Sequence, residues 1–325
     1  SPGVWFMRRR QFIGLLASAS LVGAGLPGCS RKPPLQVGVH PWIGYESLYL
    51  AEEFGWLKDT VALAKGGTGS ESARGLLEGR LDAAAITLDE ALRVMALGVP
   101  LAVIAVMDVS AGADVIMARP GMQSLDDLPG KKVAVELAGV SAIMLLRALE
   151  QAGLEPSDID VVDLPVHQHS RAWQRGEIDA SVSYEPVASV LETRGAVRLF
   201  DSRSLPETIF DVLVVNRDRA GKLRPALRDL LAGHFRGLSH LVRSFHDAIY
   251  RIATRQQVTP EAVRRALATV MLPDLSANQR YLAPGGRVEQ VAASLNQLML
   301  REGLLQMPVD LKGLCDASFL PRGPL

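Results

Sequence analysis

The sequence predicts an α/β protein of two lobes with a helical C-terminal part. Short aliphatic or β-branched runs alternate with stretches of helical periodicity, which is typical of βαβ units on a parallel sheet. The segment Arg119-Pro120-Gly121 marks a turn that interrupts this alternation, and a second series of the same kind follows it. The chain that remains after the N-terminal segment, roughly three hundred residues, exceeds one usual core and favours two.

The predicted elements follow this alternation in order. In the first series, strands are expected at 35–39, 61–64, 83–86, 101–106 and 115–118, and helices at 48–54, 71–78 and 88–96. In the second series, strands are expected at 133–135, 159–162, 180–183 and 197–200, and helices at 141–152, 169–175 and 186–193. A strongly apolar strand, 212–215, comes next. Everything beyond residue 225 is expected to be helical because apolar residues recur there with a period of 3.6, for example Leu227, Leu230, Leu231, Phe235 and Leu238.

The chain is expected to cross from one lobe to the other twice, near Ala118 and near Asp211. These crossings predict a first lobe of residues 29–118 plus 213–325 and a second lobe of residues 119–212. Two crossings make a hinge, and the cleft between the lobes is then the default ligand site.

Residues 1–28 have the three parts of an export signal. Arg8 to Arg10 lead into the apolar run 12–26, which ends at Leu26-Pro27-Gly28-Cys29. That ending resembles the bacterial lipobox, whose cysteine is diacylated and becomes the first residue of a lipoprotein. The segment 9–13 is also similar to a twin-arginine export motif. We therefore expect an anchor on Cys29 and a location in the periplasm or at the outer cell surface; the alternative is a buried N-terminal helix.

Composition excludes several classes of function. Removing residues 1–28 takes away three arginines and no acid, which leaves 32 Lys and Arg against 35 Asp and Glu and a net charge of −3. Nucleic acid is not expected as a partner because no basic stripe with interleaved aromatics occurs. With Cys29 lipidated, Cys315 has no intrachain partner. His167 and His169 lack a third ligand, so no metal is expected, and no catalytic set stands in a recognisable frame.

Four segments, in this order and spacing, resemble the solute-binding proteins of ABC importers, in the nitrate, sulfonate, taurine and thiamine-pyrimidine (NMT1-like) group. They are residues 42–51, 124–133, 176–180 and 184–186. The resemblance implies a type II periplasmic-binding fold, with two α/β lobes joined by two crossover strands. It also implies a monomer without a cofactor that hands a small solute to an ABC permease and its ATPase. The related thiamine-pyrimidine synthases need a cysteine-rich motif that this sequence lacks, so an enzyme is not expected.

Candidate ligand-binding residues lie in the loops after the strands, since ligands of open α/β sheets bind outside the carboxyl ends of strands. Trp42 and Tyr45 offer flat faces for a planar or cationic solute. Glu46 and Thr87 have an alternative role as helix caps, and Gly67 with Thr68 form either a ligand-approaching loop or a plain turn before an N-cap at Ser70. The full set is Trp42, Tyr45, Glu46, Gly67, Thr68, Thr87, Asp89, Asp108, Ser110, Asp114, Ser141, Tyr184, Glu185 and Asp211.

Acidic residues dominate this set, whereas the basic candidates Arg119 and Arg203 fall at its margins. A buried carboxylate is costly unless a partner neutralises it. The sequence therefore predicts a cationic or N–H-rich solute, such as an amine, amidine or aminopyrimidine. The alternatives are a small anion such as sulfonate or nitrate, and a ligand sensor for a membrane signalling partner.

Overall fold

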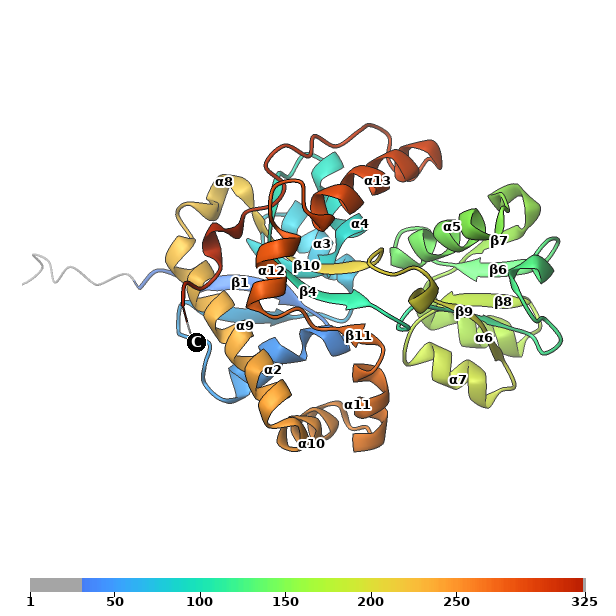
Figure 1. The fold of residues 1–325 in the computed structure, drawn as a ribbon, viewed down its shortest axis with the longest axis horizontal. Helices are drawn as coiled ribbons and strands as arrows, with labels where there is room; N and C mark the ends of the chain where they lie inside the picture. Colours follow the sequence, from blue (N-terminus) through green and yellow to red (C-terminus); the bar gives the residue numbers. More distant parts are fainter. Residues whose placement is uncertain (1–30, 324–325) are drawn as a thin grey trace, which may run out of the picture. The chain divides into compact units, whose positions relative to one another are not determined.

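Two separate β-sheets organise the computed structural model, which describes residues 31–323. The predicted export signal and Cys29 lie outside the described residues. The first sheet has six strands in the order β11-β4-β10-β3-β1-β2, and the second has five in the order β7-β6-β8-β5-β9 (Figure 1). The strands are β1 Leu35–Val39, β2 Val61–Lys65, β3 Ala83–Thr87, β4 Leu101–Ser110, β5 Val115–Ala118, β6 Lys132–Val135, β7 Asp160–Asp163, β8 Ala180–Ser183, β9 Val197–Asp201, β10 Phe210–Asn216 and β11 Val270–Met271.

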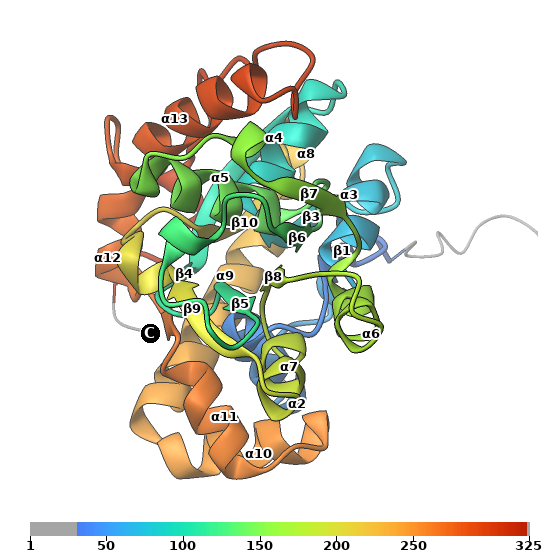
Figure 2. The same cartoon turned by 90° about the vertical axis from the view of Figure 1, so that its right-hand side faces the viewer.

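Helices cover both faces of each sheet, which is why most residues of the central strands are apolar. On the first sheet, α2 and α9 pack on one side, and α3 and α4 on the other. On the second sheet, α5 covers one face, and α6 and α7 cover the other (Figure 2). The helices are α2 Glu46–Glu53, α3 Gly69–Leu77, α4 Leu88–Ala96, α5 Val140–Ala152, α6 His169–Gln174, α7 Val187–Thr193, α8 Arg217–Ala220, α9 Arg224–Arg243, α10 Phe245–Gln256, α11 Pro260–Leu267, α12 Leu275–Tyr281 and α13 Arg287–Arg301.

Strand pairing shows where the chain passes between the sheets. We call residues 34–110 and 210–323 the first lobe, and residues 115–201 the second lobe. β5 pairs antiparallel with β8 and β9 of the second sheet, although the sequence assigned 115–118 to the first lobe. Conversely, β10 begins at Phe210 in the first sheet, which places residues 210–212 there. The crossings are therefore segments 111–114 and 202–209, and the shift arises because a local strand pattern does not specify its sheet.

The C-terminal part is mainly helical, as predicted. The periodic residues of α9, from Leu227 to Leu238, are buried on one face. The expectation of helix throughout was wrong in two places. β11 pairs with the carboxyl end of β4, and the chain near Cys315 bonds to Val103 of the same strand through backbone hydrogen bonds of 2.6 and 2.9 Å. Both segments satisfy the otherwise open outer edge of β4.

Candidate functional site

A pair of buried carboxyl groups lies at the interlobe end of the first sheet. Asp108 on β4 and Asp211 on β10 are partners in register on adjacent antiparallel strands. Their exposed fractions are 0% and 4%. Neither forms a salt bridge within residues 31–323. The central strands of the sheet therefore bring two acids together in the interior without a countercharge.

The loop after β1 supplies hydrogen-bond donors to this pair. Trp42 donates from Nε1 to Oδ2 of Asp108 at 2.9 Å, and Tyr45 donates from its hydroxyl to Oδ1 of Asp211 at 2.5 Å. Oδ1 of Asp108 is buried and has no partner. Gly44 lies between the two donors, and a Cβ there would stand 1.7 Å from Oδ2 of Asp108. The glycine is therefore needed for the loop to close over the carboxyl group.

Burial controls the ionisation of the pair. Desolvation raises the pKa of Asp108 to about 7, although the hydrogen bonds from Asp211 and Trp42 act in the opposite direction. Desolvation and the neighbouring Asp108 raise the pKa of Asp211 well above its ordinary range. Two carboxyl groups so close cannot both ionise readily, because their charges repel in a medium that screens poorly.

Two further groups reach the same place, one from the first crossing and one from the second lobe. Asp114, just before β5, is 3% exposed, and burial raises its pKa to about 7. The ring of Tyr184, which follows β8, stands edge-on to Trp42 with 6.0 Å between ring centroids. Burial raises the pKa of Tyr184, with Glu136, Glu90, Asp114 and Asp211 adding to the rise. Predicted residues from both lobes thus converge: Trp42, Asp108, Asp114, Tyr184 and Asp211.

A cation that the sequence interpretation missed lies beside this cluster. Nη2 of Arg93 on α4 is 3.7 Å from Oδ2 of Asp89, one helical turn away, which is too long for a hydrogen bond. Both Nε and Nη2 of Arg93 are buried and lack an acceptor. A cavity of about 220 Å³ is lined by residues of both lobes, namely Ser70, Ala73, Arg74, Leu77, Glu90, Arg93, Val94, Leu97 and Ala138. The sequence signal for this pair was the spacing of four residues between Asp89 and Arg93, which places the two side chains on the same face of a helix.

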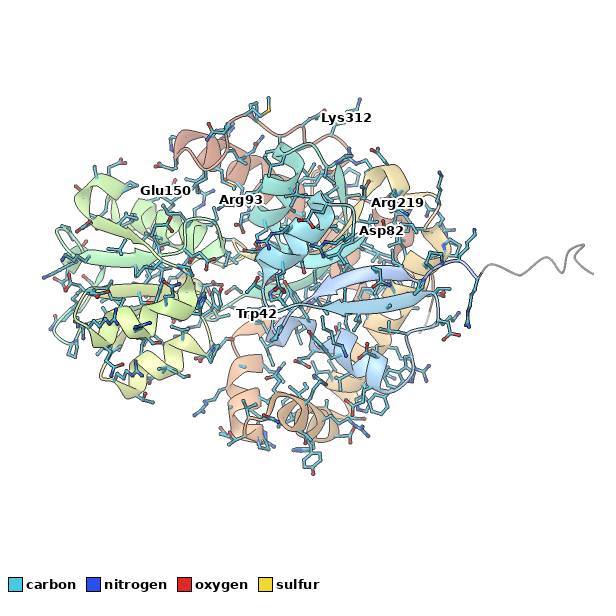
Figure 3. All side chains as sticks on the ribbon, turned by 180° about the vertical axis from the view of Figure 1, so that it is seen from behind. Trp42, Asp82, Arg93, Glu150, Arg219 and Lys312 are labelled. Carbon is cyan, nitrogen blue, oxygen red and sulfur yellow. The ribbon has the colours of Figure 1, made fainter. Side chains whose placement is uncertain are left out.

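Figure 3 shows the placement of these groups. Trp42 and Arg93 lie on the part of the first lobe that adjoins the second lobe, which carries Glu150. The ion pair of Asp82 and Arg219 lies away from that boundary. The interlobe end of the first sheet is therefore where unsatisfied charged groups gather.

Glu46 has a different role from the one predicted. It is 2% exposed, and its carboxylate accepts from Arg255 and Gln256 at the end of α10. Its charge is therefore neutralised inside the first lobe. Tyr45 also differs from the prediction, because it is fully buried and supports Asp211 from behind instead of presenting a face to a solute.

Several other candidates hold the backbone in place. Thr68 caps α3 by accepting from the Glu71 amide, and the Gly67 amide donates to the Glu71 carboxylate. Thr87 donates its hydroxyl and its amide to Glu90 at the start of α4.

In the second lobe, the Ser141 hydroxyl closes the turn before α5 by accepting from the Glu136 amide. Glu185 accepts from the amide and hydroxyl of Ser189 in α7. Of the caps expected from the sequence, the structure shows the one at Thr87. The cap of α3 is Thr68 and not Ser70, because the helix begins one residue earlier, at Gly69.

Ser110 joins the two crossings. Its hydroxyl lies 2.7 Å from that of Ser202, and the Gly112 amide donates to the same Ser202 oxygen at 2.7 Å. The Ser202 amide in turn donates to the Asp114 carbonyl at 2.9 Å. The two crossings are thus hydrogen-bonded to each other beside Asp108, Asp114 and Asp211, which we call the acid cluster. Ser110 is therefore part of the hinge between the lobes.

The remaining histidine and arginine candidates are used within the fold. His169 is buried, with Nδ1 2.7 Å from the Ser181 hydroxyl and Nε2 2.9 Å from the Leu164 carbonyl. Arg119 donates to the carbonyls of Trp173 and Ile178. Among the described residues, no group of three His, Cys, Asp or Glu side chains is arranged to hold a metal. Over the same part of the chain, no helix has the length and apolar character needed to cross a membrane.

Comparisons with known proteins agree with this architecture. A family model described as the NMT1-like family matches residues 28–252. The taurine-binding periplasmic protein of Escherichia coli (strain K12) is 31% identical over 127 residues, which are 38% of this chain and 39% of that protein. A putative aliphatic sulfonates-binding protein of the same organism is 36% identical over 88 residues, 27% of this chain and 28% of that protein. The matched stretches thus span less than half of these curated relatives, both of which are binding proteins.

Solved structures extend the likeness over nearly the whole fold. The periplasmic aliphatic sulphonate binding protein of Escherichia coli superposes with a TM-score of 0.74 at 21% identity, covering 86% of this chain and 96% of that one. The desulfurization enzyme DSZB superposes with a TM-score of 0.66 at 16% identity, covering 89% and 97%. At these identities the likeness establishes the fold alone, and this fold serves both binding proteins and an enzyme.

Proposed function

The chain belongs to the NMT1-like family, and on this premise we propose that it is an extracytoplasmic solute-binding protein that captures a small organic solute between its lobes and delivers it to an ABC importer. Its fold is the two-lobe fold of periplasmic binding proteins. The observation that supports the proposal is that buried polar atoms of Asp89, Arg93 and Asp108 lack hydrogen-bond partners at the interlobe end of the first sheet, although Arg93 lies 3.7 Å from Asp89. Such groups are costly to bury unless something else supplies their partners.

The acid cluster favours a solute with a positively charged or N–H-rich group. Asp108, Asp211 and Asp114 are all nearly fully buried at this end of the sheet. Trp42 and Tyr184 provide aromatic surface from opposite lobes beside them. An ammonium group there meets carboxylate acceptors and aromatic rings together, the two kinds of partner that recognise organic cations in proteins.

Arg93 favours an anionic group at the other end of the same solute. Its buried Nε and Nη2 donors lack acceptors, and a sulfonate or carboxylate oxygen matches the fork of a guanidinium group. We therefore propose a zwitterionic solute in preference to a simple anion such as nitrate. Taurine, an aminosulfonate, has both groups, and a taurine-binding protein is among the relatives.

Thermal unfolding with a small panel of solutes tests this proposal. The panel contains taurine, ethanesulfonate, ethylammonium and nitrate. A solute at a hundred times its Kd adds about 2.7 kcal/mol to the free energy of unfolding, which raises Tm by a few degrees. We expect the largest rise with taurine and smaller rises with compounds that have only one of its charges. Equal stabilisation by ethanesulfonate and taurine would contradict a role for the acid cluster, and stabilisation by nitrate alone would support the small-anion alternative.

Substitution of Arg93 tests the anionic end. R93Q removes the charge and most of the donor geometry, and we expect the Kd for taurine to rise about tenfold, or ~1.4 kcal/mol, as measured by calorimetry. R219Q is the matched control, because Arg219 pairs with Asp82 away from the lobe boundary. An unchanged Kd in R93Q would remove Arg93 from the site.

Delivery and anchoring complete the proposal. We infer export through residues 1–28, anchoring through lipid on Cys29, and docking of the solute-loaded protein on a permease with its ATPase. Stimulation of ATP hydrolysis by the loaded protein in proteoliposomes tests delivery, and no stimulation would favour the sensory alternative. Incorporation of labelled palmitate by the intact chain, and its loss in C29A, tests the anchor.

A further inference from the structure

Among residues 31–323, no cationic side chain forms an ion pair with Asp108 or Asp211. Each element packed around this pair contributes acids or phenols: Tyr45 from the loop after β1, Asp89 and Glu90 from α4, Asp114 from the first crossing, and Tyr184 from the second lobe. His40, whose ring contacts Tyr45, is neutral at pH 7, because burial lowers its pKa to about 4. Arg93 approaches Asp89 and not the pair.

The adjacency and burial of the two carboxyl groups favour a proton on one of them. Trp42 and Tyr45 each donate one hydrogen bond, to Asp108 and Asp211 respectively. Asp108 and Asp211 are partners in register on adjacent strands and are 0% and 4% exposed, and neither has an ion pair among residues 31–323. Oδ1 of Asp108 remains buried without a partner. Two ionised carboxylates in this position would repel each other, so the stable empty form is the acid paired with one carboxylate.

We propose that the empty site stores one proton on the Asp108–Asp211 pair and that a cationic solute displaces it, so that solute binding is coupled to proton release. The O–H bond of the carboxylic acid breaks, the proton passes to water or buffer, and the ammonium group of the solute takes over as countercharge. Capture is then selective for the charged form of an amine. This inference rests on the proposed function, since it assumes a solute with a cationic group.

The stored proton has its own measurement, which needs no solute. Infrared difference spectra of the intact protein in D₂O at pH 7 should contain the C=O stretch of a buried protonated carboxylic acid. The band should lose intensity in D211N, which cannot hold the stored proton, and should be unchanged in D229N, whose acid forms an ion pair with Lys58. Any band that remains in D211N is assigned to Asp114, because burial raises its pKa to about 7 as well. Absence of the band from the wild-type spectrum would overturn the proposal. D108N is the second variant if D211N does not fold.

Coupling is measured by titrating taurine into the wild-type protein in phosphate, HEPES and Tris, whose ionisation enthalpies differ. The slope of the observed enthalpy against buffer enthalpy counts the protons exchanged, and we expect release of about one proton at pH 7. Below the pKa of the pair, the affinity should rise about tenfold for each pH unit. D229N should retain the slope, and D211N should lose it.

The outcomes separate this inference from the function on which it rests. Taurine binding with no buffer dependence and a pH-independent Kd would overturn proton coupling while leaving solute capture intact. Failure of taurine to bind would count against the proposed solute class, and the infrared band would then decide by itself whether the pair holds a proton.

Discussion

Two buried carboxyl groups of the first lobe, those of Glu46 and Asp108, differ in whether a cationic side chain lies beside them. Glu46 at the start of α2 is 2% exposed and is neutralised by Arg255 and Gln256. Asp108 at the end of β4 is 0% exposed, accepts a hydrogen bond from Trp42 and lies in register with a second acid, Asp211. The contrast teaches that the fold can supply a guanidinium group to a buried acid where the acid serves structure. Among the described residues the Asp108–Asp211 pair has no such partner, since Arg93 at the same boundary approaches Asp89, and the pair is therefore left for a solute.

The largest expected effect comes from removing the countercharge of Glu46. R255A leaves a buried carboxylate without its ion pair, so we expect the free energy of unfolding to fall by about 3–5 kcal/mol in urea titrations. Adding E46Q to R255A should recover part of this loss. R251A is the matched control, since Arg251 forms exposed ion pairs with Glu53 and Asp247, and about 1 kcal/mol or less is expected there. A similarly small loss in R255A would erase the contrast between the two regions.

The acid pair should make the empty protein less stable as pH rises. Burial raises the pKa of Asp108 from 3.8 to about 7, so its contribution to stability is fully present below pH 3.8 and is lost as pH rises through about 7. We expect the free energy of unfolding to fall by roughly 2–4 kcal/mol between pH 5 and pH 8. D108N should flatten this dependence, whereas D229N should retain it. An equally steep dependence in D108N would show that Asp108 is already ionised at pH 5.

A smaller effect is expected where the loop closes over the pair. G44A places a methyl group 1.7 Å from Oδ2 of Asp108, which forces the loop and the carboxyl group apart. We expect a loss of about 2 kcal/mol in unfolding free energy and weaker binding of taurine. G221A is the control, because nothing lies within 4 Å of a Cβ there and its φ of −61° suits alanine. Equal stability of G44A and wild type would show that the close approach is not needed.

Local sequence patterns predicted most of the fold and selected the loops that hold the candidate site. Alternation placed β1 to β4 and the paired crossings, and the rule that ligands bind beyond strand ends selected the loops of Trp42 and Asp108. The four apolar residues of β5 did not show which sheet the strand joins, because a short apolar strand fits either sheet. The pairing of Glu46 was hidden for a different reason: its partner Arg255 is 209 positions away in the chain. Arg93 had a local signal in Asp89, four residues earlier.

The position of β10 in the middle of the first sheet has a consequence for how the chain is made. β3 and β4 are both complete by residue 110, yet they are joined only through β10, which begins at Phe210. The intervening segment, with the whole second sheet, must therefore leave the ribosome before the first sheet can close. Until then, the growing chain exposes two unpaired strand edges, one on β3 and one on β4. The first lobe is thus completed late in biosynthesis, although most of its strands are made first.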